Sequence, residues 1–137
     1  MSVKRATTAA MACMMLAFST PVMAQAPLVD TAAIKAACSK SAALCKLAVE
    51  AAIVALKAAG LSADVLNAEL GVIAGTAVSA AANLPAAEKL ALGGMLRDIA
   101  AASTNPAQQA ALVNLASAVE TGSDVDLVAF ASAISAS

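Results

Sequence analysis

Two cysteines, Cys38 and Cys45, are the residues whose type and spacing most directly suggest chemistry. They bracket the stretch CSKSAALC. On one unbroken helix, cysteines at this spacing would stand about 10.5 Å apart along the axis. A disulfide needs Cα atoms within about 7 Å of each other. A continuous helix and an intrachain disulfide are therefore mutually exclusive.

The polar stretch between the cysteines favours the disulfide. Serine side chains in Ser39-Lys40-Ser41 compete with helical hydrogen bonding. A bend there would fold a short helix, about 31–38, against a longer one, about 42–59. Thiols of exported proteins usually pair, although buried thiols and interchain disulfides stay open as alternatives. C-x₆-C also lacks the C-x-x-C spacing that lowers a thiol pKa, so we expect a structural pair.

Other chemistry is poorly supported by the residue types. The chain has no histidine, tryptophan or tyrosine, which excludes Ser/His/Asp and Cys/His sites within one chain. Asp124-x-Asp126 resembles the start of a calcium loop, but the glycine and distal glutamate do not follow in register. We therefore predict no catalytic, metal or cofactor site, and a protein that is not an enzyme.

The N-terminus has the layout of a secretory signal peptide. Lys4 and Arg5 precede an uncharged, largely apolar run over 6–18, and Val22-Met23-Ala24 provides a cleavage site. The run is shorter than the roughly 20 residues of a membrane-spanning helix. We expect residues 1–24 to be removed and the protein to be bacterial and periplasmic or secreted.

The remaining chain, 25–137, has the length of a single domain. Its six basic and nine acidic residues give a net charge of −3. There is no basic patch with interleaved aromatic residues, which argues against nucleic acid as a partner.

The alanine content and the spacing of helix-capping and helix-breaking residues predict an all-α fold, a small Ala-rich bundle of four to five helices. Capping residues and breaks divide the chain at Asp30, Gly60, Ser62, Asn83-Leu84-Pro85, Asn105 with Gln108, Thr121-Gly122, and Ser123 with Asp126. The expected helices cover about 31–59 (bent at the serines), 63–82, 86–102, 106–121 and 124–134. The uncharged stretch 70–87 raises a second membrane segment as a minor alternative, but it contains Asn83 and Pro85.

Small residues recur at helical spacing on the expected third and fourth helices. Gly71, Gly75 and Ser79 lie at i, i+4 and i+8, and Gly93-Gly94 follows in the next helix. Each interior glycine costs about 1 kcal/mol relative to alanine. Close helix packing would offset this cost, and a self-association face is the alternative.

Apolar residues are too numerous for one narrow stripe on each helix. The excess must enter a central helix, a partner interface or a ligand cavity. The expected core is Leu44, Leu47, Val49, Ile53, Val54, Leu56, Leu66, Leu70, Ile73, Leu90, Leu92, Leu96, Ile99, Leu112, Leu115, Val119, Leu127, Phe130 and Ile134.

These observations predict an exported, non-enzymatic helical protein with a structural or protein-interaction role. Self-association or binding of a protein partner would use the small-residue face. A carrier of a lipid or other apolar ligand is one alternative, and a periplasmic chaperone-like protein is another. No transmembrane segment is expected in the mature chain.

Overall fold

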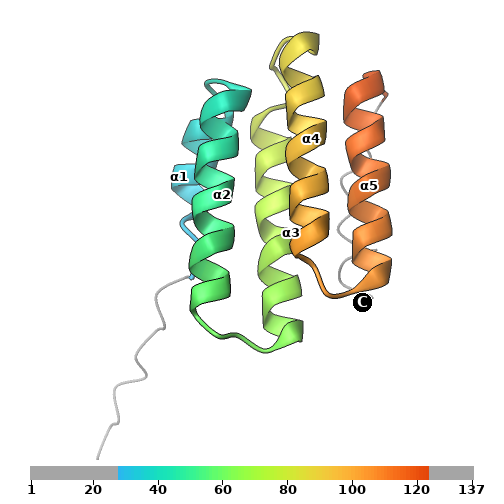
Figure 1. The fold of residues 1–137 in the computed structure, drawn as a ribbon. Coiled ribbons are helices and arrows are strands. Elements are labelled where there is room, and N and C mark those ends of the chain that lie inside the picture. The colour runs from blue at the N-terminus through green and yellow to red at the C-terminus, as the bar shows by residue number, and fades with distance from the viewer. Residues whose placement is uncertain (1–27, 124–137) are drawn as a thin grey trace, which may run out of the picture.

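The computed structural model describes residues 28–123, and these form five α-helices and no strand. The helices are α1 (Thr31–Cys38), α2 (Ala42–Ala58), α3 (Ala63–Ala80), α4 (Ala86–Ala102) and α5 (Pro106–Thr121). The four longer helices stand side by side, with the short α1 beside α2 at one edge and α5 at the other (Figure 1). The predicted all-α bundle is thus confirmed for the described part of the chain.

Most helix ends follow the predicted capping residues. The Asp30 carboxylate accepts a hydrogen bond from Ala33 N, and Asn105 Oδ1 accepts from Ala107 N and Gln108 N. Gly60 and Gly122 adopt φ of 63° and 69° just after α2 and α5, where a left-handed residue ends a helix. Ser62 differs from the prediction, because it stands at the N-cap of α3 without a side-chain capping bond.

The predicted capping box at α5 is only half formed. Asn105 caps the helix, but the Gln108 side chain does not complete the box. Gln108 is almost fully buried, donates from Nε2 to Asn67 O at 2.6 Å and accepts from Ser103 Oγ at 2.7 Å. Tertiary hydrogen bonds have replaced the local one, because a buried amide must satisfy its polar atoms wherever partners lie.

The core is continuous and rich in alanine. Its largest fully buried apolar residues are Ile34, Val49, Leu56, Leu70, Ile73, Met95, Leu96, Ile99 and Leu112. Alanines of α3, α4 and α5, among them Ala74, Ala77 and Ala116, are also buried. Short side chains let helix axes approach closely, which compensates for the small area that each alanine buries.

Four predicted core residues are instead exposed. The exposed fractions are 45% for Leu44, 63% for Leu47, 66% for Val54 and 58% for Leu90. The prediction was wrong because these helices carry apolar residues on nearly every face, so hydrophobicity did not identify the buried side. Three other predicted core residues, Leu127, Phe130 and Ile134, lie outside the described residues.

None of the helices within residues 28–123 is long and apolar enough to cross a membrane. The stretch 70–87 is divided between α3, a turn and the start of α4. The expected signal peptide over 1–24 and the expected last helix over 124–134 lie outside the described residues.

Candidate interaction surface

The outer face of α2 carries a continuous apolar stripe. Its members are Leu44, Leu47, Ala51, Val54 and Ala58, all exposed. The opposite face of the same helix buries Cys45, Val49, Ala52, Ile53 and Leu56 in the core. Since α2 lies at the edge of the bundle (Figure 1), the helix presents apolar side chains on both sides. We call these five exposed residues the α2 stripe.

Charged residues border the α2 stripe on one flank only. At 3.6 residues per turn, Lys46, Glu50 and Lys57 share one side of the stripe, whereas Ala48 and Ala55 lie on the other. Lys46 Nζ lies 3.6 Å from Glu50 Oε1, and both side chains are about half exposed. An exposed i,i+4 pair of this kind contributes only a few tenths of a kcal/mol.

The small residues predicted to form an association face occupy different environments. On α3, Gly71 is buried, Gly75 is half-buried and Ser79 is exposed. A Cβ on Gly75 would meet no described atom within 4 Å. A surface hollow of about 330 Å³ lies here, lined by Lys35, Gly75, Thr76, Ser79 and Ala80. The association role of this face stays a prediction.

The adjacent glycines of α4 also differ from each other. Gly94 is exposed, and a Cβ there would meet no described atom within 4 Å. Gly93 is buried beneath the Glu120 side chain of α5, and a Cβ on it would lie 2.6 Å from Glu120 Cδ. The absence of a side chain at Gly93 therefore makes room for an interhelical contact.

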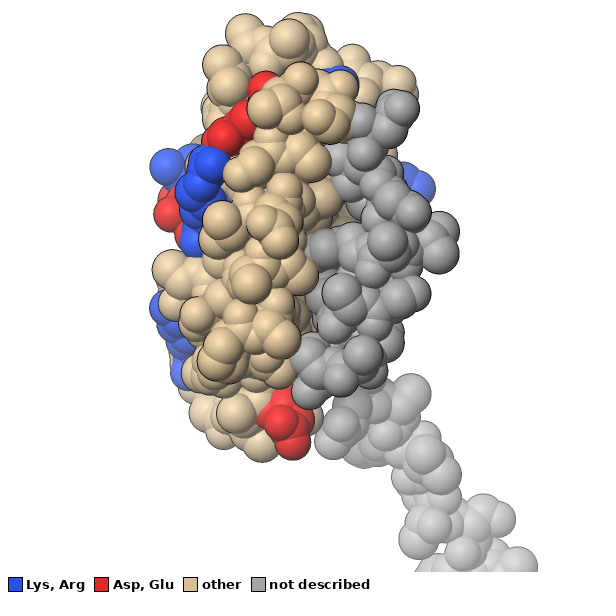
Figure 2. All heavy atoms as spheres, turned by 90° about the vertical axis from the view of Figure 1, so that its right-hand side faces the viewer, with Lys and Arg blue, Asp and Glu red and all other residues tan. Residues whose placement is uncertain are grey.

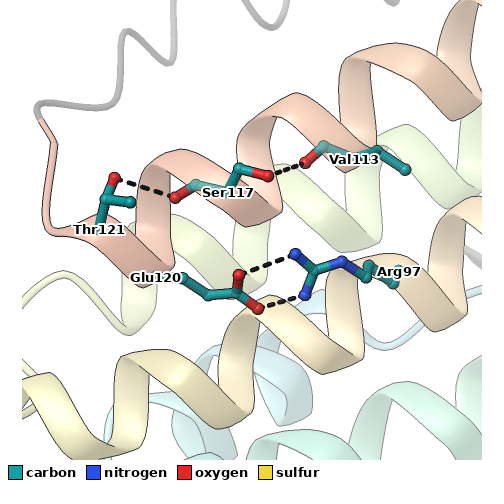
Figure 3. A network of polar contacts seen from close by, with 5 residues as sticks. All are labelled: Arg97, Val113, Ser117, Glu120 and Thr121. Carbon is teal, nitrogen blue, oxygen red and sulfur yellow. Dashed lines mark hydrogen bonds and ion pairs between the residues drawn. The ribbon is translucent and has the colours of Figure 1, made fainter.

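That contact is a bidentate ion pair between Arg97 of α4 and Glu120 of α5. Arg97 donates Nη1 to Glu120 Oε1 and Nη2 to Glu120 Oε2, the second at 2.7 Å (Figure 3). The hydrogen bond from Arg97 lowers the pKa of the Glu120 carboxyl, and the same bond raises the pKa of Arg97. Glu120 lies 23 positions from Arg97 in the sequence, so sequence reasoning missed this tertiary contact.

Glu88 also joins two helices, α4 and α2. Its Oε2 accepts a hydrogen bond from Ala42 N at 2.7 Å, and Ser41 Oγ accepts from Leu44 N at 3.3 Å. The first turn of α2 is thus capped by one local and one distant side chain. A carboxylate at this position also complements the positive end of the helix dipole.

The exposed side of α5 is almost uncharged, since Glu120 is the sole ionisable residue of Pro106–Thr121. From this side, the described surface shows a broad uncharged area with charged residues towards its edges (Figure 2). The Ser117 hydroxyl donates to Val113 O, and the Thr121 hydroxyl donates to Ser117 O (Figure 3). Both hydroxyl hydrogens are therefore directed back to the helix backbone.

The predicted disulfide is present at bonding distance. The sulfur atoms of Cys38 and Cys45 lie 1.97 Å apart. Cys38 is the last residue of α1 and Cys45 lies in the first turn of α2, so they stand on either side of the predicted bend. Both side chains are fully buried, and Met95 Sδ lies 3.7 Å from Cys45 Sγ. Burial among apolar neighbours fits a structural role for the pair.

A buried polar cluster connects α3 to the α4–α5 turn. Asn67 Oδ1 accepts from Thr104 N at 3.0 Å and lies 3.0 Å from Ser103 Oγ, whose single hydrogen has its shorter contact with Gln108 Oε1. Gln109 Nε2 donates to Ser103 O at 2.6 Å. No buried side-chain polar atom within residues 28–123 lacks a partner. A fully satisfied cluster stabilises a unique packing arrangement and offers no unpaired group for a ligand.

Across 28–123, no group of three or more potential metal ligands comes together. Comparison with known proteins adds no assignment, because no protein family, curated protein or solved structure matches the chain. The α2 stripe is therefore the best candidate functional surface. Sequence reasoning assigned its larger residues to the core, although their alternating spacing of three and four was a usable signal.

Proposed function

We propose that the chain is an exported, non-enzymatic helical protein that binds another protein chain through the α2 stripe. The observation that supports this most strongly is the exposure of Leu47 and Val54, at 63% and 66%, on the helix side opposite the core. Single exposed apolar residues are ordinary, but a contiguous apolar patch marks an interaction surface. The N-terminal layout supports a place of action in the periplasm or outside the cell.

The chemistry of the chain supports the same proposal. A protein without histidine or tyrosine, and with Cys38 and Cys45 paired, has few groups for proton transfer or nucleophilic attack. Rigid helices held by a disulfide and by the Arg97–Glu120 pair provide a preformed surface instead. A preformed surface loses less conformational entropy on binding.

The ligand-carrier alternative has weaker support. The hollow beside Gly75 is lined partly by Lys35, Thr76 and Ser79, whereas lipid pockets are enclosed and mainly apolar. Extraction of the natively purified protein with organic solvent, followed by mass spectrometry, tests this alternative. A reproducible stoichiometric lipid would support a carrier and count against the interaction role.

Photo-crosslinking in the native host tests the interaction role. We place a photoreactive residue at Val54, within the α2 stripe, and a matched one at Asp98, an exposed position on α4. We expect protein adducts of defined mass from position 54 and none from position 98. Equal labelling at the two positions, or no adduct at position 54, would contradict the proposal.

Export is tested on the same material by intact mass. We expect a chain that begins at Gln25 in the extracytoplasmic fraction. A chain that retains residues 1–24 in the cytoplasm would contradict the localisation.

A further inference from the structure

We propose that the α2 stripe binds the α2 stripe of a second copy of this chain, with the two helices antiparallel. This inference rests on the proposed interaction role and names the partner. Three features of α2 carry it: the heptad spacing of the stripe, the alternation of large and small side chains from Leu47 to Ala58, and the placement of opposite charges on its flank.

The spacing of the α2 stripe is that of a coiled-coil seam. Leu44, Ala51 and Ala58 recur every seven residues, and Leu47 and Val54 follow the first two by three. These are the a and d positions of two heptads. An ideal helix drifts only about 20° per heptad from this repeat, so two heptads remain on one face without supercoiling.

An antiparallel register pairs a large residue with a small one in each layer between Leu47 and Ala58, and Leu44 lies beyond the last of these layers. With Ala51 opposite the partner's Val54, symmetry places Val54 opposite the partner's Ala51, and Leu47 opposite the partner's Ala58. Facing large and small side chains interdigitate without voids or overlap. The interface is isologous, as a two-fold dimer requires.

The same register brings opposite charges together. Glu50 and Lys57 occupy g positions, which face g positions of the neighbour in an antiparallel pair. Glu50 and the partner's Lys57 then lie about two residues, or 3 Å, apart along the seam, and the pair occurs twice by symmetry. In a parallel pair, Glu50 would face the partner's Ala55 and this complementarity would be lost. Lys46 has the same axial offset from the partner's Lys57, but it occupies a c position, farther from the seam than Glu50. The contact between Glu50 and the partner's Lys57 therefore favours the antiparallel orientation.

Self-pairing requires no refolding of α2. A helix of this length is marginal in isolation, but α2 is held by its buried face, by the disulfide at its start and by capping from Ser41 and Glu88. The seam is short, so we expect a reversible dimer whose population depends on protein concentration.

Sedimentation equilibrium of the natively purified protein tests the pairing. We expect a monomer–dimer equilibrium, weakened by on the order of a hundredfold or more in Leu47→Glu/Val54→Glu, because the seam would then bury unpaired carboxylates. Leu90→Glu is the matched control, since Leu90 is 58% exposed but lies on α4, and it should leave dimerisation unchanged. Circular dichroism establishes that the variants retain their helices. Dimerisation unaffected by the α2 substitutions, or equally weakened by the α4 control, would overturn the inference.

A charge exchange tests the orientation without altering the apolar seam. Glu50→Lys or Lys57→Glu alone should weaken dimerisation by about tenfold at low salt, because two attractive pairs become repulsive. The double variant Glu50→Lys/Lys57→Glu should recover the native dissociation constant. Failure of the double variant to recover would rule out the antiparallel register.

The masses of the Val54 adducts distinguish this inference from the broader proposal. Adducts of twice the chain mass support both self-pairing and the broader interaction role. Adducts with a different protein, from a chain that sediments as a monomer at all concentrations, would overturn self-pairing and leave the interaction role standing. No adduct at position 54 would contradict both.

Discussion

At the scale of single residues, the neighbouring glycines of α4 should respond in opposite ways to a methyl group. Gly94→Ala adds its Cβ into open space on a helix, so we expect about 1 kcal/mol of added stability in urea unfolding. Gly93→Ala should gain less or lose stability, because Glu120 must move away from Arg97. Equal gains at the two positions would show that the contact above Gly93 is unimportant.

The Arg97–Glu120 pair gives the protein an acid-dependent contribution to stability. The folded-state pKa of Glu120 lies below its ordinary value of 4.5 because Arg97 hydrogen-bonds the carboxylate. A depressed pKa stabilises the fold above the unfolded-state value, and this stabilisation is lost as the pH falls through the folded-state pKa. Wild type should therefore exceed Glu120→Gln in urea midpoint at pH 7, and this advantage should decrease as the pH falls below 4.5 and through the folded-state pKa. A pH-independent difference would contradict this account.

The roles of single residues were predicted correctly where the interaction partner is close in sequence, and they were missed where the partner is distant. Asp30, Asn105, Gly60 and Gly122 act within their own helix ends, and the sequence neighbourhood was sufficient to identify them. Glu88 contacts a backbone nitrogen 46 positions away. No local pattern contains such a partner, because it depends on which helices become neighbours.

At the scale of helices, the disulfide should matter most to α1. In the chain-entropy picture, closing so short a loop contributes about 2–3 kcal/mol. We expect Cys38→Ala/Cys45→Ala to lose at least that much free energy of unfolding in chemical denaturation. Relative to wild type, amide hydrogen exchange should accelerate more in α1 than in α4. Reduction of the wild-type protein is the matched control and should have a similar effect. Undiminished protection of α1 would contradict the prediction.

Helix positions were predicted better than helix orientations. The break at Ser39-Lys40-Ser41 and the restarts after Pro85 and Asn105 placed every described helix within about two residues. The choice of buried face was less successful on α2, because Leu44, Leu47 and Val54 compete with Val49, Ile53 and Leu56 for the core. When both sides of a helix are apolar, tertiary neighbours decide which side is buried.

At the scale of the whole molecule, the excess of apolar residues has two destinations. One is a continuous core in which alanines pack between larger side chains, and the other is the surface, both on the α2 stripe and at single positions of α3, α4 and α5. The sequence predicted the excess but could not place it, since composition fixes the total apolar area and not its location. An apolar edge helix on a disulfide-anchored bundle is consistent with a protein whose assembly continues beyond one chain.

Val29 and Asp30 limit how much of the N-terminus can be removed without loss of stability. Cleavage after Ala24 retains Val29, which is 2% exposed, and Asp30, which caps α1. A chain beginning at Thr31 would lose both, at a cost of about 2–4 kcal/mol from valine burial and the lost cap. We therefore expect the chain beginning at Gln25 to unfold at a higher urea concentration than the chain beginning at Thr31, with Asp30→Ala in the longer chain accounting for about 1 kcal/mol. Equal midpoints for the two chains would mean that the bundle begins after Asp30 and that Val29 contributes nothing to its core.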